Sequence, residues 1–169
     1  MLATLLALTS FAAAQEVPAP DPNGYYVGGR SGVAVPINTV GLAFPTSFEA
    51  GIHFPSNMSV GLRFTFQQDP PEMFGYDAPW AVGPLLDGRR FFRINQNIEL
   101  YGDLALGFIF GIDEPTGRNA VMPIGSAGIG ARVMPGDSRV YIAPEFGVTS
   151  FTVPYMGLAL GIGTKPELL

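Results

Sequence analysis

The chain has 169 residues and a formal net charge of −5, and charged residues make up only 14% of it. A soluble domain usually carries about 25% charged residues, so this chain has too few charges to cover an ordinary water-facing surface. Its length suggests one domain with a sizeable core. The acidic balance offers no basic patch for phosphates, so no nucleic-acid partner is expected. The chain has no cysteine, which excludes disulfides, thiol catalysis and cysteine-ligated metal centres.

Residues 1–14 form an apolar segment that ends in Ala12, Ala13 and Ala14, the small-residue pattern of a signal-peptide cleavage site. The Lys or Arg that usually precedes the apolar stretch is missing, so either the signal is atypical or its true start lies elsewhere. An ordinary short N-terminal helix is the alternative interpretation. We expect a signal peptide at 1–14, and therefore export, followed by a Pro-rich extended lead-in at 15–23.

Beyond the N-terminus, Gly and Pro interrupt every apolar run, so no stretch of about 20 apolar residues could cross a membrane as a helix. Residues instead alternate between apolar and polar with a period of two, which predicts strands. The pattern is clearest over 98–112, where bulky apolar residues alternate with acidic or small ones. Near Gly88 it predicts a bulge, because Arg90 falls on an apolar face. Eight strands are predicted, at 25–35, 47–54, 58–67, 80–92, 98–112, 121–134, 139–149 and 154–162.

The connectors between these predicted strands alternate in length, except for the last one at 150–153, which is short. Short connectors are expected at 55–57, 94–97 and 135–137, and longer ones at 36–46, 68–79 and 113–120. Short turns at one end and longer loops at the other are typical of an up-and-down transmembrane barrel. We therefore expect an all-β fold, an eight-stranded antiparallel up-and-down transmembrane β-barrel over 24–163, with a C-terminal tail at 164–169.

The charges indicate which face of the sheet is the interior. A charged side chain that faces lipid at the midplane costs about 2–4 kcal/mol, and the bulky face, rich in Leu, Phe, Ile and Val, carries only Arg90. The other face is rich in small residues, which fit a narrow interior. A soluble exported barrel, which needs a polar outer face and an apolar inner one, is therefore the weaker alternative. The predicted interior charges are Arg30, Glu49, Arg63, Asp87, Arg89, Glu99, Asp103, Arg132, Arg139 and Glu145.

Aromatic residues gather toward both ends of the predicted strands, as in the two interfacial girdles of membrane barrels. Tyr25, Phe54 and Phe92 lie toward the short connectors. Phe residues are also common in strands generally, so the girdles support the membrane interpretation without deciding it. The residues toward the long connectors are Phe48, Phe66, Trp80, Phe110 and Phe146.

Two segments carry a resemblance to a known family. Residues 83–92 read GPLLDGRRFF and residues 97–107 read NIELYGDLALG. This hairpin resembles the small eight-stranded outer-membrane β-barrel family of Gram-negative bacteria, of the OmpA transmembrane-domain or OmpX type, and the resemblance covers 24–163. It implies a monomer in the bacterial outer membrane with lipid around it. The family normally ends in an aromatic residue soon after a segment like YMGLAL at 155–160, whereas this chain ends in TKPELL.

The predicted interior charges nearly balance, with five arginines against five carboxylates. An eight-stranded barrel is just wide enough for its side chains to fill, and an unpaired interior charge is costly. We therefore expect a charge-paired, closed lumen and a structural or surface-interaction role. A small ion or solute channel, opened when the same charges exchange partners, is the alternative.

A lipid-modifying enzyme is a further alternative. His53 is the only histidine, and Glu49, Ser47 and Ser59 are near it in the sequence; a hydrolase needs such a base, acid and nucleophile. The group would face the lumen near the periplasmic end, away from outer-leaflet lipid, so we expect no catalytic residue, and we also expect no cofactor and no metal site. The loops at 36–46 and 68–79 hold apolar residues that would contact either a surface partner or the membrane interface.

Overall fold

A computed structural model of the chain describes residues 24–35, 42–54, 56–68, 80–113, 117–136, 138–149 and 153–164. The expected signal peptide, the lead-in and residues 165–169 lie outside this part. The strands are β1 (Gly24–Ala34), β2 (Phe44–Phe54), β3 (Met58–Gln68), β4 (Trp80–Asn95), β5 (Ile98–Asp113), β6 (Arg118–Val133), β7 (Val140–Thr149) and β8 (Val153–Gly163). The described part contains no helix long and apolar enough to cross a membrane.

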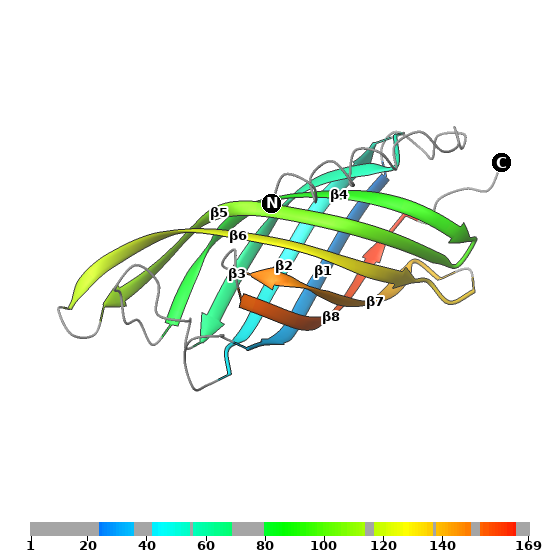
Figure 1. The fold of residues 1–169 in the computed structure, drawn as a ribbon. Helices are drawn as coiled ribbons and strands as arrows, with labels where there is room; N and C mark the ends of the chain where they lie inside the picture. Colours follow the sequence, from blue (N-terminus) through cyan, green and yellow to red (C-terminus); the bar gives the residue numbers. More distant parts are fainter. Residues whose placement is uncertain are drawn as a thin grey trace, which may run out of the picture.

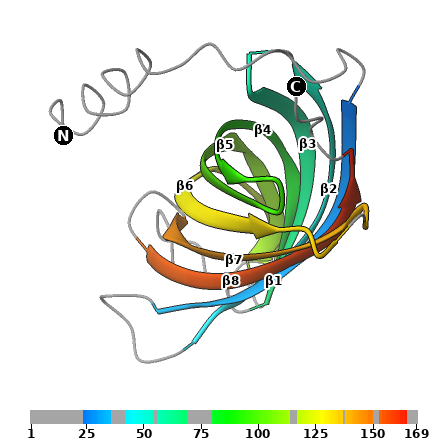
Figure 2. The ribbon, with the colours of Figure 1, turned by 90° about the vertical axis from the view of Figure 1, so that its right-hand side faces the viewer.

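Every strand pairs antiparallel with the next one, and β8 returns to pair with β1, so the sheet closes into a barrel (Figure 1). Figure 2 shows β1 and β8 side by side at this closure. The all-β, eight-stranded antiparallel fold predicted from the alternation is thereby confirmed. We call the end that holds Gly24, Gly163 and the β2–β3, β4–β5 and β6–β7 connectors the turn end, and the opposite end the loop end.

Several strands extend further than the side-chain pattern indicated. β2 begins at Phe44, which pairs with Gln68, so the loop expected at 36–46 ends earlier than predicted. Asp113 pairs with Arg118, which reduces the expected 113–120 loop to 114–117. Backbone pairing does not depend on which side chains alternate, and it continues after the apolar pattern fades. Residues 36–41 and 69–79, which include most of the predicted partner loops, lie outside the described residues.

The bulge predicted near Gly88 is wrong. Asp87 and Arg89 are buried while Leu86 and Phe92 are exposed, so β4 alternates regularly through this position. The register shifts instead between Arg93 and Asn95, next to the turn into β5. Regular alternation means that Arg90 lies on the outer face of the barrel.

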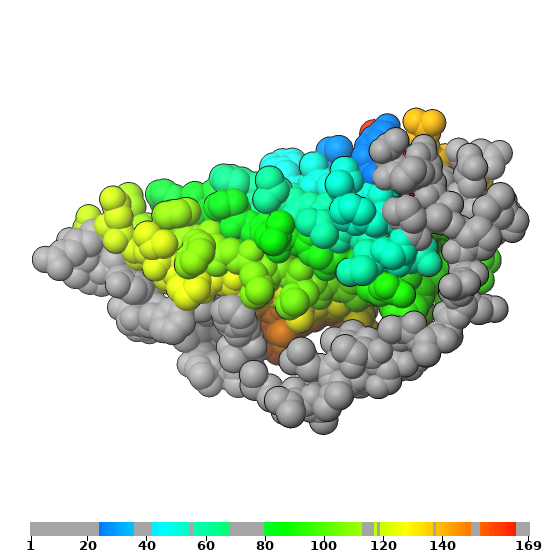
Figure 3. Space-filling model, turned by 90° about the horizontal axis from the view of Figure 1, so that it is seen from above, coloured from blue at the N-terminus to red at the C-terminus, as the bar shows by residue number. Residues whose placement is uncertain are grey.

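Burial is reversed relative to a water-soluble barrel. The outer face carries large apolar side chains, and Phe48, Ile129 and Leu62 expose 71%, 67% and 64% of their surface. Figure 3 shows the outer surface over β2 to β6, coloured cyan to yellow. Asp87 and Glu145, in contrast, are fully buried. Such an apolar surface far exceeds the patches that soluble monomers expose, and it is the arrangement that a lipid environment favours.

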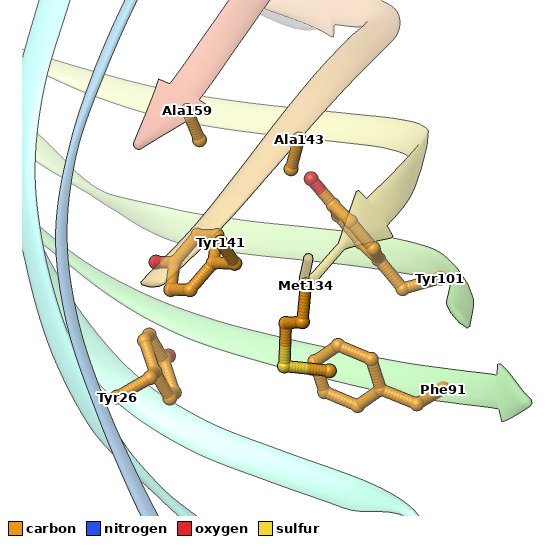
Figure 4. Packing of buried hydrophobic residues seen from close by; sticks show 7 residues of the cluster. All are labelled: Tyr26, Phe91, Tyr101, Met134, Tyr141, Ala143 and Ala159. Carbon is orange, nitrogen blue, oxygen red and sulfur yellow. The ribbon is translucent and has the colours of Figure 1, made fainter. Parts of the chain in front are cut away.

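The interior has apolar packing on both sides of a charged layer. Along β4 the inward residues run from Ala81 and Leu85 at the loop end, through Asp87 and Arg89, to Phe91 at the turn end. The loop-end cluster consists of Ala81, Leu85, Ala105, Ile109, Met122 and Ile124. Figure 4 shows the turn-end cluster, which consists of Tyr26, Phe91, Tyr101, Met134, Tyr141, Ala143 and Ala159.

Candidate functional site

The candidate site is a layer of buried charges in the middle of the lumen. Strand alternation places one or two ionisable side chains from β1, β2, β3, β4, β5 and β7 on the inner face, and closure of the sheet brings them together. We call this set the central cluster. Its members are Arg30, Glu49, Arg63, Asp87, Arg89, Asp103 and Glu145.

Arg63 of β3 links its own strand to three others. Its Nη2 atom lies 2.5 Å from Oδ1 of Asp87 and 2.8 Å from Oδ2 of Asp103. Its Nη1 atom donates to Oγ of Ser126 at 3.0 Å. The guanidinium of Arg63 therefore ties β3 to β4, β5 and β6 through charge-assisted hydrogen bonds, which are the stronger kind.

Arg30 of β1 and Arg89 of β4 supply the remaining arginines of the central cluster. Arg30 Nη2 lies 2.8 Å from Glu145 Oε1 and 3.3 Å from Glu49 Oε2. Arg89 contacts Glu49 as well, and its Nη2 atom lies 2.9 Å from Oδ2 of Asp87. Each of these three carboxylates thus contacts at least one arginine, as a buried charge requires.

Tyrosine hydroxyls supply further donors to the same carboxylates. Tyr26 donates to Oδ2 of Asp87 at 3.2 Å, and Tyr141 donates to Oε1 of Glu49 at 3.3 Å. Tyr101 donates to Glu145. Arg30 Nη1 donates to the hydroxyl of Tyr155 at 3.5 Å, which joins β8 to the cluster. The tyrosines therefore belong to the polar network and not only to the apolar packing.

A second charged group lies toward the turn end. Arg132 Nε donates to Glu99 Oε2 at 2.8 Å, and Arg93 Nε lies 3.8 Å from the other Glu99 oxygen. The guanidinium of Arg132 stacks over the ring of Phe91, with its Cζ atom 4.5 Å from the centroid. This contact is a cation–π interaction, so the group combines ion pairing with aromatic packing.

His53 lies beside this second group. Its Nε2 atom is 3.3 Å from Nη1 of Arg132, and its ring contacts those of Tyr26 and Phe91 at centroid distances of 5.4 and 5.3 Å. Ser59 is directly opposite His53 in the strand register, but its buried hydroxyl has no hydrogen-bond partner in the described part of the chain. A nucleophile–base hydrogen bond is therefore not formed between these two residues.

A small cavity adjoins the central cluster on its loop-end side. It has a volume of about 40 Å³, and Arg30, Arg63, Ser47, Thr65 and Ser126 are among its lining residues. A water molecule needs roughly 10–15 Å³ of such volume and two to four polar partners, so the cavity has room for a few waters and not for a larger solute. Among the described residues, no group of three or more acidic or histidine side chains is arranged to hold a metal ion.

Comparison with known proteins gives matches in structure alone. No protein-family model and no curated protein matches the sequence. The N-terminal β-barrel domain of Pseudomonas aeruginosa OprF matches with a TM-score of 0.59 and 14% identity, over 84% of this chain and 98% of that one. Neisserial surface protein A matches with a TM-score of 0.55 and 11% identity, over 86% and 97%. Ail, the attachment invasion locus protein of Yersinia pestis, matches with a TM-score of 0.52 and 16% identity, over 85% and 98%.

The chain has the fold of the small eight-stranded outer-membrane β-barrels. The expected resemblance in fold is thereby confirmed. Identities between 11% and 16% show the fold of such a barrel alone.

Within this outer-membrane barrel fold, nine of the ten residues predicted to face the lumen are buried. Seven of them form the central cluster, and Glu99 and Arg132 form the second group. The prediction that Arg139 faces the lumen is wrong. It precedes β7, which begins at Val140, and its side chain is exposed at the turn end. Alternation assigns a face only inside the barrel wall, and beyond the strand end an arginine reaches water.

The sequence reasoning also missed some members of the network. Tyr26, Tyr101, Tyr141 and Tyr155 occupy inward positions of the same alternating pattern, so their places were visible in the sequence. Buried tyrosine hydroxyls usually find a hydrogen-bond partner, and this rule combined with the inward positions would have identified them as donors to the carboxylates. Arg93, which contacts Glu99, lies just beyond the predicted strand, which ends at residue 92.

Proposed function

We propose that the chain is a bacterial outer-membrane β-barrel whose lumen is closed by the central cluster, with a structural or surface-interaction role and no catalysis. One observation carries this proposal. All eight strands contribute to a single connected set of contacts across the lumen, because Ser126 of β6 and Tyr155 of β8 join the charged residues of the other six strands.

The apolar outer face supports the membrane part of the proposal. Exposed Leu, Ile, Val and Phe side chains occur on every strand of the barrel, whereas a soluble barrel needs a water-compatible exterior. Strand pairing around a closed barrel also satisfies the backbone polar groups, which lipid cannot do. With the turn end on the periplasmic side, the β1–β2 and β3–β4 connectors face the outside of the cell.

The packing of the interior supports a closed lumen. Apolar clusters lie on both sides of the central cluster, and the cavity beside it has room for only a few waters. Opening a path would require several buried arginines and carboxylates to separate, and removing one partner of a buried pair typically costs about 3–5 kcal/mol. A small channel would need these charges to exchange partners, so that alternative is an outcome of the test below.

The surface-interaction part of the proposal rests on the loop end. The connectors between β1 and β2 (35–43) and between β3 and β4 (69–79) are longer than the other connectors between strands, and the second contains Phe74 and Tyr76. Exposed apolar residues on such loops are typical of contact sites. Among the structural neighbours, Ail is described as an attachment invasion locus protein, which is in keeping with a role in surface contact.

The test combines membrane extraction with single-channel recording. We expect the chain in the outer-membrane fraction, with heat-modifiable gel migration, and no steady openings in a planar bilayer. Arg63→Ala removes contacts to Asp87, Asp103 and Ser126 and should introduce openings, while Arg139→Ala, the matched exposed control, should change nothing. A wholly soluble chain would overturn the membrane assignment. Steady wild-type openings that Arg63→Ala or Glu99→Ala abolishes would overturn the closed lumen in favour of a channel.

A further inference from the structure

One charged side chain departs from the apolar character of the outer face. Arg90 of β4 is partly exposed on this face, and it is the only charged residue that alternation turns outward among the strand residues whose side chains are described. No hydrogen bond or ion pair links Arg90 to any carboxylate in the described part of the chain. Among the described residues, the lipid-facing wall therefore carries one cation, and no carboxylate of that part of the chain neutralises its charge.

Arg90 borders a groove in the outer wall. Its cross-strand partner is Gly102 of β5, and Gly88 lies two residues before it on β4. A side chain added at Gly88 or Gly102 would meet nothing closer than 3.9 and 3.8 Å respectively, so open space lies over both glycines. The groove has a volume of about 1010 Å³ and runs over β3 to β7. Its apolar walls include Val60, Leu86, Phe92, Leu104, Ile129 and Phe146.

The strand register gives the depth of Arg90 in the membrane. Phe54 at the end of β2 pairs with Met58, and Met58 pairs with Arg90. The same line of cross-strand partners continues from Arg90 through Gly102 and ends at Val33, near the loop end of β1. Each step along this line therefore moves away from the turn end and toward the loop end. With strands about 4.8 Å apart and tilted by about 40°, Arg90 lies about 6 Å deeper in the apolar layer than Phe54.

Phe92 lies two residues after Arg90 on β4, toward the turn end. Its depth in the membrane is therefore about the same as that of Phe54. Both rings are partly exposed, with 38% and 39% of their surface accessible, as expected for aromatic residues at a membrane interface. A long arginine side chain extends toward the interface from this depth. From this depth the guanidinium of Arg90 reaches the level of the lipid phosphates, and the groove lies on the loop-end side of it, at the level of the acyl chains.

We propose that this groove, the Arg90 groove, binds one anionic glycerophospholipid of the periplasmic-side leaflet. Arg90 donates to the phosphate in the two-hydrogen-bond geometry that a guanidinium favours. One acyl chain runs over Gly102 and Gly88 against Leu104 and Ile129. The anionic lipid is favoured over a zwitterionic one because the described part of the chain offers Arg90 no carboxylate partner. This proposal rests on the proposed function, since lipid reaches the groove only if the barrel spans a membrane.

The test is native mass spectrometry of the full chain released from nanodiscs that contain equal amounts of phosphatidylglycerol and phosphatidylethanolamine. We expect one retained phosphatidylglycerol on the wild type. Arg90→Gln should lower its retention about tenfold, which is the scale of one charge-assisted hydrogen bond, and Arg90→Lys should lower it less. Gly102→Leu keeps the charge but fills the groove, and it should also lower retention.

Gly29→Leu is the matched control, because Gly29 faces outward with open space starting at 3.8 Å but lies outside the Arg90 groove. It should leave retention unchanged. Equal retention of both lipids in all variants would show that Arg90 is only an interfacial anchor and would overturn the site. Displacement by free glycerol phosphate would overturn the acyl-chain part. Heat-modifiable migration of the same samples separates these results from failure of the proposed function, in which no variant would insert at all.

Discussion

Arg63 on β3 and Asp103 on β5 contact each other across the lumen, with 2.8 Å between Nη2 and Oδ2, although β4 separates their strands in the sheet. The contact therefore runs through the interior of the barrel and not along its wall. Asp103 also pairs with Arg30 at 3.3 Å, and this contact joins β5 to β1 on the opposite side of the barrel. The central cluster is consequently expected to hold the barrel's cross-section as well as to fill its lumen.

Replacement of Arg63 tests the energetic part of this statement. Arg63→Ala leaves Arg30 as the only arginine partner of Asp103 and Arg89 as that of Asp87, in an interior with room for only a few waters. We expect a loss of about 3–5 kcal/mol in the free energy of unfolding, measured by equilibrium denaturation in lipid vesicles. Arg139→Ala, at an exposed position, should change it by less than about 0.5 kcal/mol. Equal effects of the two substitutions would contradict the cross-lumen role of Arg63.

The tyrosine donors can be tested separately from the charges. Tyr101→Phe keeps the ring in the turn-end cluster but removes the hydroxyl that donates to Glu145. We expect destabilisation by about 1–3 kcal/mol, the cost of an unsatisfied buried acceptor, in the same denaturation experiment. The control is Tyr25→Phe, since Tyr25 lies on the outer face with 44% of its surface exposed. An unchanged unfolding midpoint for Tyr101→Phe would show that Arg30 alone satisfies Glu145.

The fold and the inner face could be predicted because both depend on a local pattern. Period-two alternation assigns Glu49 and Asp103 to the interior without knowledge of their neighbours. The partners could not be predicted in this way. Which arginine meets which carboxylate depends on how far each strand is shifted against the next, and the shift accumulates around the closed barrel. The contact between Arg30 of β1 and Glu145 of β7, for example, exists only after β8 has closed the sheet.

Gly51 provides a test of how tightly the lumen is filled. A Cβ atom at this position would approach the ring of Tyr26 to 2.6 Å, and that ring also contacts His53 and Arg89. We expect Gly51→Ala to destabilise the barrel by about 1–3 kcal/mol through overpacking. Gly29→Ala on the adjacent strand has open space and should be nearly neutral. Measured unfolding free energies that do not differ between the two would mean that the Tyr26 ring moves aside at little cost.

Substitution of Leu62 separates a membrane barrel from a soluble one. Leu62 lies four residues into β3 with 64% of its surface exposed. In a lipid bilayer, Leu62→Arg places a charge near the midplane, and we expect a loss of about 2–4 kcal/mol in the free energy of unfolding. Ile94→Arg, near the turn end of β4, is the matched control and should cost only about 0–1 kcal/mol because its charge reaches the interface. In a water-exposed barrel both substitutions would be close to neutral, so equal small effects in vesicles would contradict the proposed membrane-facing exterior.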